Sequence, residues 1–96
     1  MTARFLRAAE NEMVAAARYY EHKSFNLGRR FLAEVERTLK AIMAFPDSGT
    51  PMGGGIIRRL LRTFPFALLY VNSSEELTVI AVMDLRRSPD YWKGRA

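Results

Sequence analysis

Arginines account for most of the chemistry that the second half of this sequence could perform. They gather in one segment before the apolar runs and again directly after the last of those runs: Arg58, Arg59, Arg62, Arg86 and Arg87. Guanidinium groups form forked hydrogen bonds with phosphates and carboxylates, and they can stabilise a charged transition state. The pattern predicts a surface that binds an anionic target or an acidic partner. The alternative is that these arginines are solvated edges that resist aggregation.

The spacing of the first three arginines limits which of them can act together. In an extended strand alternate side chains point to the same face. Arg58 and Arg62 are therefore expected on one surface and Arg59 on the other.

Two aromatic residues in the tail are further candidates. Tyr91 and Trp92 could stack on bases or fill a pocket of a partner. A short tail that follows a sheet also needs a large side chain to anchor it. We expect Trp92 to lie in the core, and we keep both residues as candidates for binding.

The remaining reactive residue types form no recognisable site. The only histidine, His22, has no paired carboxylate or serine, and cysteine is absent. The glycines at 53–55 precede a predicted strand, whereas a phosphate cradle needs a helix directly behind it. The glutamates are expected on solvated helix surfaces: Glu10, Glu12, Glu21, Glu34 and Glu36. No metal or cofactor is predicted.

Length and charge narrow the class of protein. Residues 1–96 suffice for a single domain with a modest core, so a bound partner is expected to add stability. The net charge of +5 favours an acidic partner or nucleic acid. The N-terminus lacks the apolar run of a signal peptide, and no stretch is long enough to span a membrane. A cytoplasmic location without membrane association is expected.

Apolar periodicity predicts two helices in the first half. Small and aromatic residues at spacings of three and four predict a helix over 8–21, and Leu27 begins a second stripe that ends before Pro46. That stripe consists of Leu27, Phe31, Val35, Leu39 and Ile42. The short connection predicts an antiparallel hairpin, and the alanines of the first helix allow close packing.

The second half reads as a loop followed by strands. Proline and glycine predict a loop over 46–55, and apolar or β-branched runs predict strands over 56–63, 66–71 and 77–83. Residues 4–6 are extended as well. The fold class is therefore α+β, with a short N-terminal strand, a helical hairpin and a three-stranded antiparallel sheet. The helices are expected to cover one face of this sheet and to leave the other face free.

In their order, these segments resemble the RelE/ParE superfamily, whose members are often labelled plasmid stabilisation proteins. Five motifs contribute to the resemblance: Glu10 with Ala15-Ala16-Ala17-Arg18-Tyr19-Tyr20-Glu21, Leu27-Gly28-x-x-Phe31-x-x-Glu34, Pro46-x-x-Gly49, Arg58-Arg59 with Phe64-Pro65-Phe66 and Tyr70, and Arg86-Arg87-x-Pro89-x-Tyr91-Trp92-x-x-Arg95. The resemblance implies the toxin of a type II toxin–antitoxin system. It also implies a cognate antitoxin as partner, with operator DNA bound only through the antitoxin and no small-molecule cofactor.

The superfamily divides by target into ParE-like poisons of DNA gyrase and RelE-like ribosome-dependent messenger RNA endoribonucleases. For a RelE-like activity the resemblance implies a catalytic set of Arg58, Arg62, Arg87 and Tyr91. Where many relatives carry histidine this chain has Asp84, and a carboxylate repels a phosphate. The interpretation is therefore a ParE-like growth inhibitor, with the endoribonuclease and a non-toxic basic binding module as alternatives. The residues predicted to bind target or antitoxin are Arg58, Arg59, Arg62, Arg86, Arg87, Tyr91 and Trp92.

Overall fold

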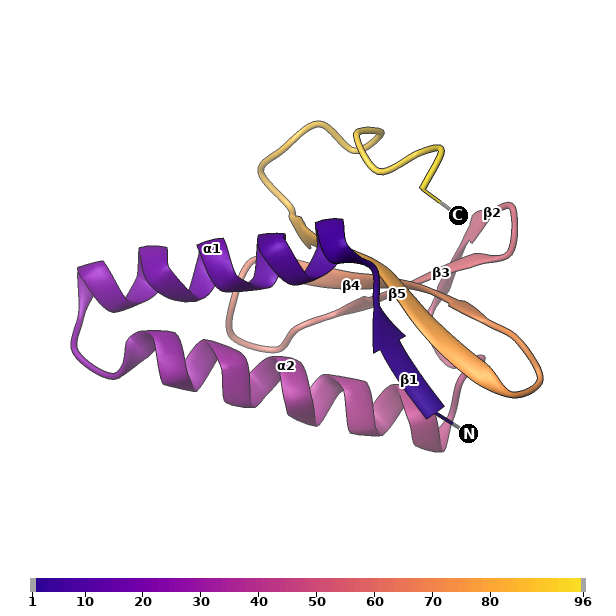
Figure 1. The fold of residues 1–96 in the computed structure, drawn as a ribbon, viewed down its shortest axis with the longest axis horizontal. Helices are drawn as coiled ribbons and strands as arrows, with labels where there is room; N and C mark the ends of the chain where they lie inside the picture. The colour runs from indigo at the N-terminus through magenta and orange to yellow at the C-terminus, as the bar shows by residue number, and fades with distance from the viewer. Residues whose placement is uncertain (1, 96) are drawn as a thin grey trace.

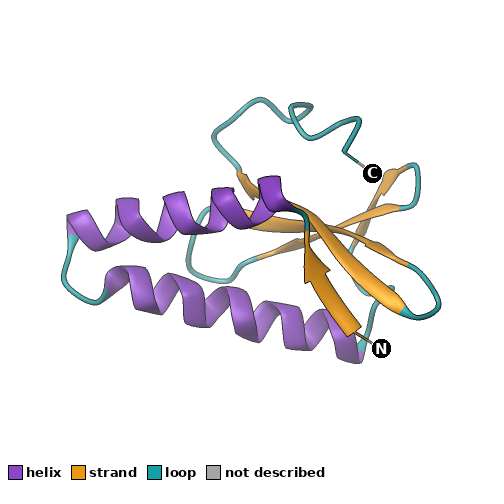
Figure 2. Cartoon of the chain, viewed as in Figure 1, coloured by secondary structure: helices purple, strands orange, loops and turns teal. Residues whose placement is uncertain are grey.

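The computed structural model describes residues 2–95, which form two helices packed against one sheet (Figures 1 and 2). In chain order the elements are β1 (Thr2–Phe5), α1 (Arg7–Lys23), α2 (Leu27–Ala44), β2 (Thr50–Gly53), β3 (Ile56–Leu60), β4 (Phe66–Asn72) and β5 (Glu76–Asp84). An irregular tail follows β5 and returns past the N-terminal half of α1 (Figure 1). This order confirms the predicted α+β fold with its N-terminal strand and helical hairpin.

The helical hairpin depends on small residues and on one carboxylate at its turn. A β-carbon placed on Gly28 would lie 2.5 Å from the carbonyl oxygen of Ala17, so only glycine allows this approach of the helices. The carboxylate of Glu21 accepts hydrogen bonds from the backbone N–H groups of Asn26 and Gly28, both at 2.9 Å. These bonds satisfy N–H groups at the start of α2, which have no partner within the helix.

The sheet is larger than the three strands predicted from the sequence. It has five strands in the order β1-β5-β4-β3-β2, with β1 parallel to β5 and the other pairs antiparallel. The loop predicted over 46–55 contains β2, because Thr50 and Pro51 pair with β3 despite the proline and glycines around them. The strand predicted to reach residue 63 ends at Leu60, and a turn occupies 61–65.

Buried side chains cover both faces of the sheet. On one face the α2 stripe, with Phe31, Val35 and Ile42 fully buried, packs over β4 and β5. On the opposite face Trp92 is 2% exposed and packs in a cluster with Leu69 and Met83. The expectation that this second face is free is therefore wrong, since the tail folds back over it. The indole anchors the tail in the core, as its size predicted.

Candidate functional site

The three arginines of the β3 region do not lie as simple strand alternation predicted. Arg58 stands opposite Leu69, which belongs to the face covered by the tail, whereas Arg59 stands opposite Leu68 on the helix face. Because β3 ends at Leu60, alternation does not extend to Arg62. Arg62 lies beside Arg59 instead, next to α2. The prediction that Arg58 and Arg62 share one surface is wrong.

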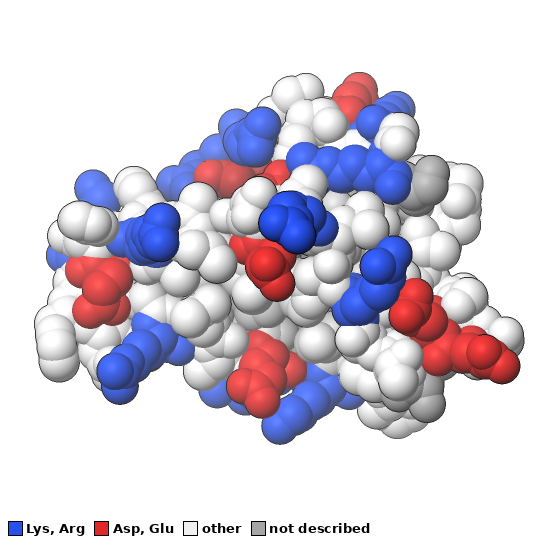
Figure 3. Space-filling model, viewed as in Figure 1, with Lys and Arg blue, Asp and Glu red and all other residues white. Residues whose placement is uncertain are grey.

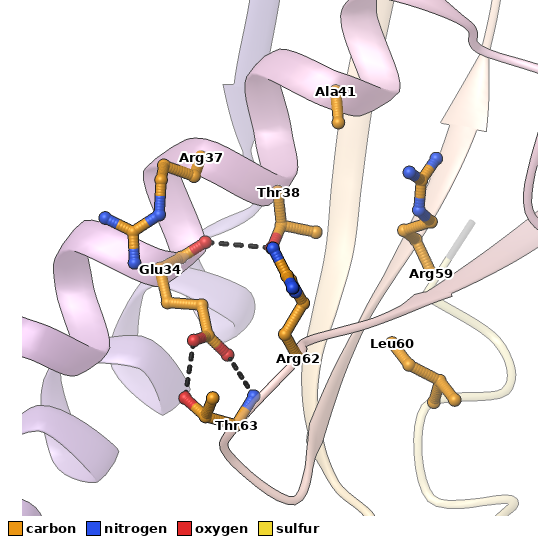
Figure 4. Close-up of a pocket in the computed structure, with 8 residues that line it drawn as sticks. All are labelled: Glu34, Arg37, Thr38, Ala41, Arg59, Leu60, Arg62 and Thr63. Carbon is orange, nitrogen blue, oxygen red and sulfur yellow. Dashed lines mark hydrogen bonds between the residues drawn. The ribbon is translucent and has the colours of Figure 1, made fainter.

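Arg59 and Arg62 line a hollow between α2 and the end of β3, which Figure 4 shows in close-up. Its volume is about 470 Å³, and Arg37 of α2 contributes a third guanidinium group. Ala41 and the half-exposed Leu60 supply apolar surface. We call this feature the arginine hollow. Within residues 2–95, none of its three arginines forms an ion pair with a carboxylate.

A buried glutamate fixes the turn that carries Arg62. Glu34 is 5% exposed, and its carboxylate accepts hydrogen bonds from the Thr63 backbone N–H at 2.9 Å and from the Thr63 hydroxyl at 2.6 Å. Burial alone would raise the pKa of Glu34, but the hydrogen bonds from Thr63 and the adjoining backbone outweigh it and lower the pKa. Glu34 is therefore ionised and bound to the turn, so it leaves the guanidinium groups unneutralised.

Arg59 is held from the other side of the arginine hollow. Its Nη1 donates a hydrogen bond of 2.5 Å to the hydroxyl oxygen of Ser48, and that hydroxyl donates to the carbonyl oxygen of Phe45 at 2.8 Å. The same loop is fixed by the Tyr70 hydroxyl, which donates to the carbonyl oxygen of Pro46 at 2.6 Å. The position of Arg59 is thus set before any ligand arrives.

Arg86 and Arg87 line a separate hollow of about 340 Å³ beside α1, which shares no residue with the first. Arg86 forms a forked pair with Asp84, with two hydrogen bonds of 2.9 Å. This pairing lowers the pKa of Asp84 against the opposing effect of burial. Arg87 approaches the carboxylate of Glu12 at 3.8 Å. Both arginines therefore already form ion pairs with carboxylates of this chain.

Glu12 and Arg95 together close the exposed edge of β5 beyond the end of β1. The two side chains are paired at 3.0 and 3.2 Å, and Arg95 also donates to the carbonyl oxygen of Ile80 at 3.1 Å. Glu12 accepts a hydrogen bond from the backbone N–H of Val82 at 3.1 Å. The pair therefore satisfies the backbone N–H of Val82 and the carbonyl of Ile80, which have no partner strand at this edge within the described part of the chain. Because Glu12 is in α1 and Arg95 is in the tail, the pair also links the tail to α1.

Tyr91 packs beside the Glu12–Arg95 pair and contacts two arginines. The guanidinium group of Arg87 stacks 3.9 Å from the centre of its ring, and that of Arg95 lies at 5.1 Å. Burial and the neighbouring Glu12 carboxylate raise the pKa of Tyr91. The phenol therefore stays protonated at neutral pH and is poorly suited to accept a proton as a general base.

The implied endoribonuclease set is divided between the two sides of the sheet, because Tyr91 packs on the face covered by the tail and Arg62 lies on the side of the helices. Arg87 and Tyr91 are in contact. Arg58 is on the sheet face covered by the tail, and Arg62 is in the arginine hollow. Of the wider binding set, Arg59 and Arg62 lie together, as do Arg86 and Arg87, while Trp92 is buried away from the surface.

Sequence reasoning missed Glu12 and Glu34, which were expected on solvated helix surfaces. That expectation is wrong for both residues, because each carboxylate binds groups of the sheet half. A signal was present in the sequence. Each glutamate follows a fully buried residue by three positions, Ala9 or Phe31, and so shares that residue's face of the helix.

Among residues 2–95 no three His, Cys, Asp or Glu side chains gather where they could hold a metal ion. Within the same range no helix has the length and apolar character needed to cross a membrane.

Comparison with known proteins gives a structural relative. No family model and no curated protein matches the sequence. Among solved structures, a chain of the "Chromosomal ParDE TA system from P. aeruginosa" superposes with a TM-score of 0.64, covering 90% of this chain and 97% of that chain at 13% sequence identity. This chain therefore shares the fold of that ParDE chain. The agreement extends over nearly the whole of both chains.

Proposed function

We propose that this protein is the toxin of a type II toxin–antitoxin pair, neutralised by a cognate antitoxin, and that it inhibits growth by acting on DNA gyrase. The observation that supports the proposal most strongly is the match over nearly the full chain to a structure of a ParDE toxin–antitoxin system. The ordered motifs of the sequence, which resemble those of the RelE/ParE superfamily, support the same assignment independently.

The placement of the arginines favours a gyrase poison over an endoribonuclease. Cleavage of RNA requires basic groups and a proton acceptor within reach of one phosphate. Here Arg62 lies beside α2, apart from the contacting pair Arg87 and Tyr91, and the raised pKa of Tyr91 opposes its use as a base. A toxin that acts by binding a protein does not need these groups to converge.

Neutralisation can be tested in the cell with the genes beside this one. We expect induced expression of this chain alone to arrest growth, because the free toxin is active. Co-expression of the small protein encoded next to it should restore growth, and the two should purify as a complex. Arrested growth is the key readout, since a non-toxic basic binding module would bind the neighbour yet leave growth unchanged. Normal growth on expression of the folded protein alone would refute the proposal.

A further inference from the structure

The arginine hollow has the properties of a binding site that the chain itself leaves open. Three guanidinium groups surround it, and no ion pair within residues 2–95 uses any of them. The arginines beside α1 differ, because Asp84 and Glu12 already pair with them. Three positive charges against the single carboxylate of Glu34 leave the hollow net positive. An anionic group entering it would meet guanidinium groups that are not paired with Glu34, whose carboxylate is bound to Thr63.

The Arg59 side chain is positioned in advance, as is the backbone that carries the other two arginines. Ser48 holds Arg59, and the hydrogen bonds from Thr63 to Glu34 fix the turn that carries Arg62. Arg37 lies one helical turn beyond Glu34 on α2, a rigid element. Side chains whose positions are restricted lose less conformational entropy when a ligand binds, so affinity rises.

The surroundings of the hollow favour a peptide carboxylate over a nucleic-acid phosphate. Leu60 is 50% exposed at the rim, and Ala41 lies beside it, so an apolar side chain next to the anion would be partly buried. A nucleic-acid backbone needs a continuous basic track. On the face drawn in Figure 3, acidic groups are interspersed among the basic ones.

We propose that the arginine hollow binds a glutamate or aspartate side chain of an acidic segment of the partner protein, with a neighbouring apolar residue packed on Leu60. This rests on the proposed function, which supplies the partner. The forked geometry of arginine suits a carboxylate, and Arg37, Arg59 and Arg62 offer donors from two sides (Figure 4).

The test is a titration of the isotope-labelled full chain, followed by nuclear magnetic resonance. The probes are a short capped peptide with two glutamates beside one leucine, its counterpart with glutamine for glutamate, and a short DNA duplex. We expect the acidic peptide to shift the Thr63 amide and the Nε–H signals of Arg59 and Arg62. The glutamine peptide should leave them in place. Arg62→Gln should weaken binding at least about tenfold, since a hydrogen bond to a charged group is lost.

Arg29→Gln is the matched control, because Arg29 is an exposed arginine of α2 outside the hollow. It should bind the acidic peptide as the parent does. Equal binding of the glutamine peptide, or larger shifts of the same signals with DNA, would overturn the inference.

The failure of this inference can be distinguished from the failure of the proposed toxin function. If the adjoining gene product neutralises growth arrest equally well against the parent and Arg62→Gln, the hollow is not its site and the toxin assignment stands. If the peptide binds here but expression of the chain never arrests growth, the toxin assignment is wrong and the anion-binding property of the hollow stands.

Discussion

Replacing Trp92 by alanine is expected to lower the free energy of unfolding by about 3–5 kcal/mol. The indole is 2% exposed and covers the second face of the sheet, where it packs in one cluster with Leu69 and Met83. A core of this size supplies roughly 3–5 kcal/mol in total, so the variant should be largely unfolded by itself. Thermal melting followed by circular dichroism measures the loss directly, because it needs no tryptophan.

Phe25→Ala is the control for this prediction. Phe25 is 92% exposed at the turn of the hairpin, and its loss should change stability by no more than about 0.5 kcal/mol. The antitoxin proposed as partner, if it binds the native state, should partly restore the Trp92 variant, because a ligand of the native state stabilises it by mass action. If Trp92→Ala melts like Phe25→Ala, the tail is not held by its indole, and Trp92 becomes a candidate for contact with the target.

Replacing Glu34 by glutamine is expected to cost about 1.5–3 kcal/mol at neutral pH. Glutamine removes the charge that the Thr63 N–H and hydroxyl bind, and hydrogen bonds to charged groups contribute about this amount. The effect should depend on pH. Because the pKa of Glu34 is lower in the folded chain than its ordinary value of 4.5, its contribution is complete above that value. It is lost as the pH falls through the folded pKa.

Urea unfolding of parent and variant from pH 7 down to acid conditions measures this difference. The gap between the two proteins should be widest at neutral pH and should shrink below about pH 4.5. Glu36→Gln is the matched control, since Glu36 lies on the exposed side of α2 and, among the described residues, forms its one ion pair with Lys40 at 3.6 Å. A gap between parent and Glu34→Gln that is the same at every pH would show that the carboxylate charge is not what holds the turn.

The elements with strong local patterns could be predicted from the sequence. The spacing of Phe31, Val35 and Ile42 gave the buried face of α2, and the apolar runs gave β4 and β5 within one residue at each end. These patterns suffice to predict the elements, because the spacing of side chains on one face follows directly from the geometry of a helix or a strand.

What could not be predicted depends on contacts between distant segments. β2 is a strand only because it pairs with β3, since Pro51 and the glycines after it favour a turn. Glu12 and Glu34 are bound by groups that lie 70 and 29 residues further along the chain. Arg62 departs from strand alternation because β3 stops two residues earlier. In each case tertiary structure overrides a local preference.

A toxin that binds a protein and a nuclease are distinguished by adding the purified chain to two reactions. One is supercoiling of relaxed plasmid by DNA gyrase, and the other is translation of a defined messenger RNA on ribosomes. Because Arg62 lies beside α2, apart from Arg87 and Tyr91, and the pKa of Tyr91 is raised, we expect supercoiling to stop and the messenger RNA to remain intact. Undisturbed supercoiling together with ribosome-dependent cleavage of the messenger RNA would show that the chain is an endoribonuclease and not a gyrase poison.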